Sequence, residues 1–293
     1  MSNHQRRFAA FYSLRICVKS SAKKGIGRMN RYEILKEKLK GREKIVGTLI
    51  TLTVSAPMIE IIAGEAYLDY VIFDMEHGSF NNENLITPLQ VCRLCGMPAF
   101  VRVPDHTNFH IARCLDLGAD GIMLPRTESV EQVRAAVEAM RFPPVGHKGK
   151  GGYCQVRPGE TLADFNRSRH LLVQIESPVG IAALPDMLDR YGSEIAAIII
   201  GPYDLSFTMG MPAQFDDPAF QNAVKEIFDI CISRKKSVGI FCDGPAQAEK
   251  YLEMGANFMW ICTDDQIVKA GLRAMVAPIA ETPKAPGAAA DSV

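Results

Sequence analysis

Eight short apolar runs, rich in β-branched residues, recur along the chain with segments of helical periodicity between them. They begin at Ile45, Tyr70, Ala99, Gly121, Leu171, Ala196, Val238 and Phe258. Strands that alternate with helices are typical of a parallel sheet covered on both faces. Eight such units fit a (β/α)8 TIM barrel, which commonly takes about 250 residues. The sequence therefore predicts an α/β barrel, with a doubly wound open sheet as the alternative.

The segments between the runs carry apolar residues at the spacing of one helix face. Two such faces are formed by Val130, Val133, Val137 and Met140 and by Val268, Leu272, Met275 and Ile279. Ser129 and Gln132 have the spacing of a capping box, so a helix should begin there.

The two ends of the chain differ from the rest. Residues 1–28 contain seven basic and no acidic residues, which predicts a disordered basic extension or, alternatively, an organellar transit peptide. Removing them leaves 26 basic and 33 acidic residues, a balance that argues against a nucleic-acid surface. We expect the barrel domain over residues 29–280 and a disordered Pro/Ala-rich tail over 281–293.

No apolar run approaches the roughly 18 residues that cross a bilayer, so we expect no membrane partner. The eight cysteines are spread through predicted strands and helices without a secretory signal ahead of them. Reduced thiols in the cytoplasm are the simplest explanation. Cys92 and Cys95 form a lone C-x-x-C pair, which is better explained by a helix end than by a metal or redox site.

Polar side chains end several of the apolar runs. They are Asp74, Glu76 and His77 after the second run, Arg102 after the third, Gln174 and Glu176 after the fifth, and Asp204 after the sixth. In a barrel these ends meet on one face, where active sites lie. The alternative is that such residues only cap strands and pair with one another.

Glu176 and Asp204 would place two carboxylates on adjacent strands, which suits Mg²⁺ or Mn²⁺. A 2-oxo acid could complete the coordination, and the metal would then stabilise an enolate. Arg102 offers bidentate geometry for the same acid, or alternatively an ion pair with Glu76 or Asp74.

His77 is a candidate for proton transfer, with Asp116 as the carboxylate that orients it. No Lys ends any of the eight runs, which argues against an imine-forming aldolase. Lys148 and Lys150 instead lie on a long Gly/Lys-rich loop that we expect to be solvated and near the active-site face. His106 and His110 have zinc spacing only if they share a helix.

Over residues 44 to 280 the chain resembles the HpcH/HpaI aldolase family. The matching stretches are DMEH at 74–77, VRVP at 101–104, LDLGADGIMLP at 115–125, RFPPVGHKG at 141–149, VQIES at 173–177 and GPYDLS at 201–206. The resemblance implies a phosphoenolpyruvate/pyruvate-binding TIM barrel. It also implies a metal-dependent class II aldolase that cleaves a 4-hydroxy-2-oxo acid or a 2-keto-3-deoxy sugar acid to pyruvate and an aldehyde.

The resemblance further implies a role for each candidate. Glu176 and Asp204 would bind the divalent cation, with Mg²⁺ favoured over Mn²⁺ or Co²⁺. Arg102 would hold pyruvate and its enolate, and Gln174 and Glu76 would support substrate binding. The proton-handling pair would be His77 with Asp116.

The same family commonly forms homo-oligomers, often hexamers whose last helix packs on a neighbouring subunit. Two departures from the family pattern bear on substrate choice: Lys148 replaces a usual Arg, and the first run, GTLITL, lacks a common Trp. The alternative activities are a decarboxylase acting on an oxaloacetate-like acid and a non-catalytic barrel.

Overall fold

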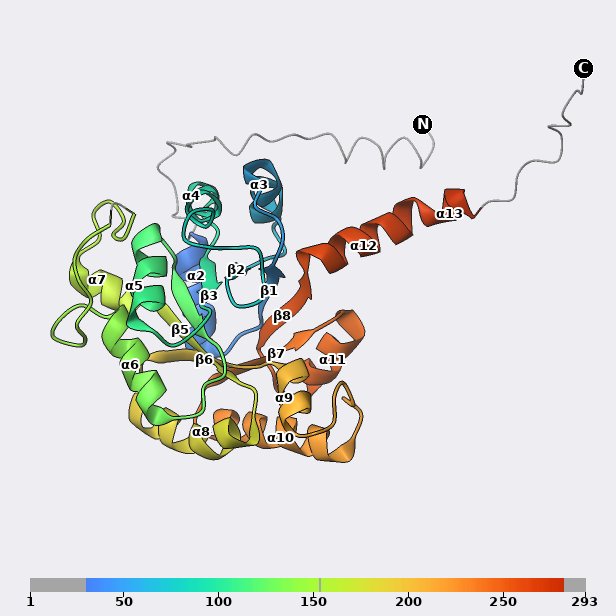
Figure 1. The fold of residues 1–293 in the computed structure, drawn as a ribbon. Coiled ribbons are helices and arrows are strands. Elements are labelled where there is room, and N and C mark those ends of the chain that lie inside the picture. Colours follow the sequence, from blue (N-terminus) through green and yellow to red (C-terminus); the bar gives the residue numbers. More distant parts are fainter. Residues whose placement is uncertain (1–29, 153, 282–293) are drawn as a thin grey trace, which may run out of the picture.

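A computed structural model describes residues 30–152 and 154–281 (Figure 1). The extension predicted for residues 1–28 lies outside this part of the chain, as does all of the predicted tail except residue 281. No helix within the described ranges combines the length and the apolar character that a membrane crossing requires.

Eight parallel strands close into a barrel in sequence order. They are β1 (Ile45–Ile50), β2 (Tyr70–Asp74), β3 (Ala99–Arg102), β4 (Gly121–Leu124), β5 (His170–Ile175), β6 (Ile195–Ile200), β7 (Ser237–Cys242) and β8 (Phe258–Thr263). Each predicted run forms a strand, so the predicted TIM barrel is confirmed. The open-sheet alternative is wrong, because β1 pairs with both β2 and β8.

Helices surround the barrel (Figure 1). Their bounds are α2 (Arg31–Gly41), α3 (Ala56–Gly64), α4 (Ile86–Cys95), α5 (Asn108–Leu117), α6 (Val130–Met140), α7 (Leu162–Ser168), α8 (Pro178–Tyr191), α9 (Pro202–Thr208), α10 (Pro218–Ser233), α11 (Pro245–Glu253), α12 (Asp264–Met275) and α13 (Ala277–Ala280). The capping box predicted at Ser129 and Gln132 opens α6. Cys92 and Cys95 lie at the end of α4, as expected for a helix.

Aromatic side chains fill the barrel interior near the start of the strands. The ring of Tyr70 lies 5.4 Å from that of Phe100 and 4.6 Å from that of Phe258, and all three are buried. The Tyr70 hydroxyl donates to the carbonyl of Met259 at 2.8 Å. Gly47 makes room for this ring, because a Cβ there would overlap it. The interior is therefore packed at this end, and ligand space is left at the other.

The described residues of the long loop over 141–161 lie at the amino ends of the strands, which corrects the expectation that the loop borders the active site of its own chain. It follows α6 and leads through α7 into the start of β5. Lys148 is buried rather than solvated, because its ammonium donates to Asp116 at 2.7 Å and to the Ala112 carbonyl at 3.2 Å. A loop that joins a helix to the next strand must run at this end of a barrel.

His106 and His110 do not form a metal pair. His106 precedes α5 and its ring contacts the Pro125 carbonyl and the Gln132 side chain. His110 pairs instead with Asp105 at 2.8 Å.

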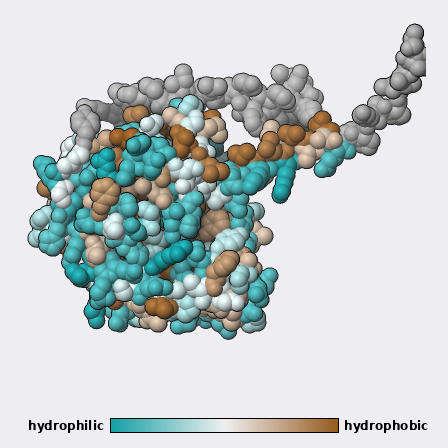
Figure 2. Space-filling view, viewed as in Figure 1, coloured by the Kyte–Doolittle hydropathy of each residue, from teal (hydrophilic) through white to brown (hydrophobic). Residues whose placement is uncertain are grey.

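The last two helices, α12 and α13, leave the barrel as an arm (Figure 1). Their predicted apolar face exists, but it is exposed instead of packed on the barrel. Figure 2 shows this apolar surface along the arm, formed by Ile267, Val268, Leu272, Met275, Val276 and Ile279. These side chains are between 48% and 77% exposed. Contiguous exposed apolar surface is a common feature of interaction sites.

Candidate active site

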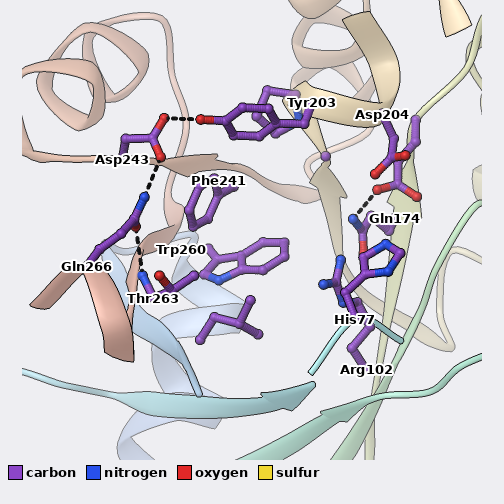
Figure 3. Close-up of a pocket in the computed structure, with 14 residues that line it drawn as sticks. His77, Arg102, Gln174, Tyr203, Asp204, Phe241, Asp243, Trp260, Thr263 and Gln266 are labelled. Atoms are coloured by element: carbon purple, nitrogen blue, oxygen red, sulfur yellow. Dashed lines mark hydrogen bonds between the residues drawn. The ribbon is translucent and has the colours of Figure 1, made fainter. Parts of the chain in front are cut away.

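A pocket of about 310 Å³ opens at the carboxyl ends of the strands (Figure 3). Five of the residues predicted from the sequence line it, namely His77, Arg102, Gln174, Glu176 and Asp204. They come from the ends of β2, β3, β5 and the start of α9, so the closed barrel brings together side chains far apart in the sequence.

Glu176 and Asp204 form the acidic side of the pocket. Glu176 is only 3% exposed, and its carboxylate accepts the backbone N–H of Arg126 at 2.9 Å and a bond from the Gln174 amide. Burial, together with the negative charges of Asp204 and Glu76, raises the pKa of Glu176 to about 8. A buried carboxyl surrounded by other carboxylates is an environment that favours a cation.

Gly201 lets this acidic side form. A Cβ at position 201 would overlap the Glu176 carboxylate and approach the Gln174 amide nitrogen to 2.7 Å. The main chain can therefore enter α9 directly beside Glu176, and Asp204 follows in the first turn of that helix.

The donor set fits a hard divalent cation. Two carboxylates supply charged oxygens, and the carbonyl oxygen of Gln174 beside them is buried without a hydrogen-bond partner. Within residues 30–152 and 154–281 no group of three or more His, Cys, Asp or Glu side chains is arranged to hold a metal. A cation here would thus take Glu176 and Asp204 as its carboxylate ligands and complete its shell with oxygens of water and substrate.

Arg102 lies deep in the pocket and is held by Asp74. Its Nε and Nη2 donate to the two oxygens of Asp74 at 2.8 and 2.7 Å, and its Nη1 lies 3.3 Å from Glu76. The guanidinium carbon also stacks 5.5 Å from the centre of the Trp260 ring. The predicted ion pair therefore exists together with the predicted position in the pocket.

His77 stands at the mouth of the pocket with its side chain 53% exposed, and its Nε2 lies 3.7 Å from Glu76. Glu76 itself lies behind the lining, where it contacts Arg102 and Arg126. Burial raises the pKa of Glu76, while Arg102 opposes the shift.

The structure does not bring Asp116 to His77 within one chain. Asp116 lies in the last turn of α5, at the amino ends of the strands, whereas His77 follows the carboxyl end of β2. Its carboxylate accepts from Lys148 at 2.7 Å and from the amide of Gln155 at 2.6 Å. The pairing implied by the resemblance thus has no counterpart in the isolated chain.

The far side of the pocket was not foreseen from the sequence. Asp243 accepts hydrogen bonds from Tyr203 and Gln266, each at 2.8 Å, and Phe241 and Trp260 form an apolar wall beside it (Figure 3). The signal that could have found Asp243 is its position directly after the seventh apolar run, where it is the first polar residue.

Comparison with known proteins agrees with this geometry. Residues 51–270 match the family model described as HpcH/HpaI aldolase/citrate lyase. The 2-keto-3-deoxy-L-rhamnonate aldolase of Salmonella typhi is 32% identical over 251 residues, which cover 83% of this chain and 91% of the relative.

Solved structures share the architecture. An HpcH/HpaI aldolase from Desulfitobacterium hafniense DCB-2 superposes with a TM-score of 0.78 at 28% identity, covering 85% of this chain and 98% of that one. A protein of the HpcH/HpaI aldolase/citrate lyase family from Burkholderia cenocepacia J2315 gives the same TM-score at 24% identity, over 84% and 99% of the two chains, and supports the fold alone. The chain therefore belongs to the HpcH/HpaI aldolase/citrate lyase family and is a carbon–carbon lyase.

Proposed function

We propose that the chain is a divalent-metal-dependent aldolase that cleaves a 2-keto-3-deoxy sugar acid, or a related 4-hydroxy-2-oxo acid, to pyruvate and an aldehyde. The observation that carries this proposal is the placing of Glu176 and Asp204 in one pocket with Arg102. The relative from Salmonella typhi, named for an acid of this class, supports it.

Glu176 and Asp204 would hold the cation, and their hard oxygen donors favour Mg²⁺, with Mn²⁺ or Co²⁺ as substitutes. When bound, the cation polarises the keto oxygen of the substrate and lowers the energy of the enolate. Gln174 would keep the Glu176 carboxylate in place through their hydrogen bond.

Arg102 would bind the 2-oxo acid and stabilise the growing negative charge. Its fork is held rigid by Asp74, which removes the cost of orienting it during the reaction. Glu76 contributes indirectly, because it lies beside both Arg102 and Arg126.

In the cleavage, the C3–C4 bond breaks and its electron pair forms the enolate of pyruvate. The C4 hydroxyl loses its proton and becomes the aldehyde carbonyl, and a proton is later added to C3 to give the methyl group. His77 would handle these protons, since its exposed imidazole stands at the mouth of the pocket.

Asp116 could orient His77 only from a second chain, because the two residues lie at opposite ends of the barrel. The exposed apolar face of α12 and α13 supports the same assembly. We therefore propose a homo-oligomer, with the family's hexamer as the expected form, in which the arm of one chain packs on its neighbour.

The proposed site of action is the cytoplasm. Cys92, Cys114 and Cys231 are buried and form no disulfide, which suits a reducing compartment. Burial raises the pKa of the Cys114 thiol to about 12, so this group stays protonated and unreactive at neutral pH.

The test is pyruvate release from 2-keto-3-deoxy-L-rhamnonate, with and without a chelator. We expect activity that chelator removes and Mg²⁺ restores, and we expect Glu176→Gln or Asp204→Asn to abolish it without loss of fold. Asp189→Asn is the matched control, because Asp189 is 58% exposed and pairs with Arg234 on the surface. Full activity in chelator, or in either pocket variant, would disprove metal dependence.

A further inference from the structure

One carboxylate of the pocket has no part in the proposed cleavage. Asp243 follows β7 and lies across the pocket from His77, Arg102 and Gln174, with Phe241 and Trp260 in between (Figure 3). This is the side toward which the aldehyde half of a substrate would extend when its 2-oxo acid half is held at Arg102.

Neutral donors fix Asp243 in place. Its Oδ2 accepts from the Tyr203 hydroxyl and its Oδ1 from the Gln266 amide, each at 2.8 Å. Gln266 is held in turn by the backbone N–H of Thr263 at 2.9 Å. Burial and the neighbouring Asp243 raise the pKa of Tyr203 to about 12, so its hydroxyl remains a donor at neutral pH.

Among the described residues, no cationic side chain pairs with this carboxylate. In the part of the chain that the structure describes, no Lys, Arg or His nitrogen lies within 4.0 Å of Asp243. The two guanidinium groups near the pocket are committed elsewhere, because Arg102 pairs with Asp74 and Arg126 lies 3.5 Å from Asp204. Within the described residues of one chain, the negative charge of Asp243 therefore faces the pocket without a cationic partner.

Such a carboxylate distinguishes between substrates by their charge and by whether they donate hydrogen bonds. Each of its oxygens has accepted one hydrogen bond in the structure and has a further lone pair for a substrate hydroxyl. A second carboxylate on this half of the substrate would be repelled by the charge of Asp243, in a pocket where apolar walls weaken screening by water. An interaction that rejects the wrong partner is as important for specificity as one that attracts the right one.

We propose that Asp243 determines the charge of the aldehyde half that the enzyme accepts: a neutral aldehyde bearing hydroxyl groups is favoured, and one bearing a carboxylate is excluded. This inference rests on the proposed aldolase function. It assigns to Asp243 a specificity role and leaves enolate formation to the other side of the pocket.

The experiment measures aldol addition of pyruvate to lactaldehyde, which is neutral, and to succinic semialdehyde, which carries a carboxylate. For the wild-type enzyme we expect kcat/KM to be at least about tenfold higher with lactaldehyde. Asp243→Asn should shift this ratio by at least about tenfold toward succinic semialdehyde. Tyr203→Phe keeps the charge and should shift it by less than about threefold. Asp189→Asn should leave the ratio unchanged.

A second readout separates this inference from the proposed function. Exchange of the pyruvate methyl protons with solvent deuterium needs no aldehyde, so Asp243→Asn should retain it, which also shows that the variant is folded. A wild-type enzyme without exchange overturns the proposed function and this inference with it. Normal exchange with an unchanged aldehyde ratio in Asp243→Asn, or a wild-type preference for succinic semialdehyde, overturns the role of Asp243 alone.

Discussion

Arg102 serves both the fold and the pocket with one guanidinium. Its fork is satisfied by Asp74, which is completely buried, and the same guanidinium lines the pocket beside Trp260. The sequence had presented the ion pair and the substrate contact as alternatives. The structure shows that the ion pair with Asp74 fixes the position of the guanidinium.

Arg102→Lys should therefore lose both stability and activity. A lysine ammonium cannot bond both oxygens of Asp74 in the same geometry, so we expect unfolding free energy to fall by about 1–3 kcal/mol. We also expect kcat/KM for pyruvate release to fall by roughly 10²-fold, the effect of losing one preorganised charge donor. Denaturant unfolding and steady-state kinetics measure the two effects. A less stable variant with wild-type kcat/KM would show that Arg102 is structural only.

His170 predicts how the free energy of unfolding depends on pH. Burial, assisted by the nearby charges of Arg141 and Arg169, lowers its pKa from 6.5 to about 3. Between these values the unfolded chain binds the proton and the folded chain does not. Above about pH 6.5 His170 therefore does not lower the free energy of unfolding. Between about pH 6.5 and pH 3 its contribution to stability is lost, and the free energy of unfolding falls by up to about 1.4 kcal/mol per pH unit.

Urea unfolding at a series of pH values from 7 to 4 measures this slope. We expect His170→Gln to reduce this slope by up to about 1.4 kcal/mol per pH unit, the contribution of one proton, because the variant has no imidazole to protonate on unfolding. The control is His147→Gln, since His147 is exposed, and its slope should match the wild type. An unchanged slope in His170→Gln would contradict the prediction.

At the scale of elements, Asp264 joins the exits of β1 and β8. Its carboxylate accepts the backbone N–H groups of Thr51, Leu52 and Thr53 at 2.9, 3.1 and 2.7 Å, and the Thr51 hydroxyl at 2.7 Å. These bonds lower the pKa of Asp264 even though burial opposes the shift. The loop after β1 is thereby fixed beside the start of α12.

Asp264→Ala should release this loop. Four donors lose their acceptor at once, so we expect a loss of about 3 kcal/mol or more in unfolding free energy. Hydrogen exchange of the Thr51 and Thr53 amides should accelerate more than that of the β5 amides. Asp265→Ala is the control, because Asp265 is partly exposed and its carboxylate bonds Lys269 and the Thr263 hydroxyl instead of the loop after β1. Equal effects of the two substitutions would refute the role given to Asp264.

Strands and helices could be predicted from the sequence where a single physical signal identified them. Buried parallel strands must be apolar and favour β-branched residues, so each of the eight runs identified a strand. The strand ends converge in a closed barrel, so Glu176, Arg102 and Gln174 could be placed in one pocket. Asp243 was missed because its significance depends on lying across the pocket from these residues, a relation that barrel closure creates.

Other expected contacts failed because they depend on which end of the barrel a segment occupies. Asp116 and the loop over 141–161 were expected beside the active site, but a segment that ends a helix lies at the opposite end. Their mutual contacts, such as Lys148 with Asp116, form a local network that no sequence spacing indicated.

At the scale of the whole molecule, periodicity predicted the last helix but could not indicate the surface it covers. Burying six exposed apolar side chains contributes on the order of 10 kcal/mol, and association costs roughly 4–15 kcal/mol. One arm barely offsets that cost. Two arms exchanged symmetrically would double the gain, so reciprocal packing between chains is the arrangement that the energetics favour.

Leu272→Asp, on the apolar face of α12, should therefore weaken the assembly. Burying an unpaired carboxylate in an apolar interface is costly, whereas the arm itself does not contact the barrel through this face. Sedimentation at micromolar concentration should show a smaller species than the wild type, with barrel secondary structure intact. Exchange of the pyruvate methyl protons should decrease when the assembly dissociates, because the dissociated chain holds its own Asp116 at the wrong end of the barrel for His77.

The control is Arg273→Gln, on the other side of α12, which should sediment and exchange as the wild type does. A wild-type protein that sediments as a monomer, or a Leu272→Asp protein that remains fully assembled, would exclude the arm as the interface. A dissociated variant with full exchange would keep the interface but remove Asp116 from the proton-handling pair.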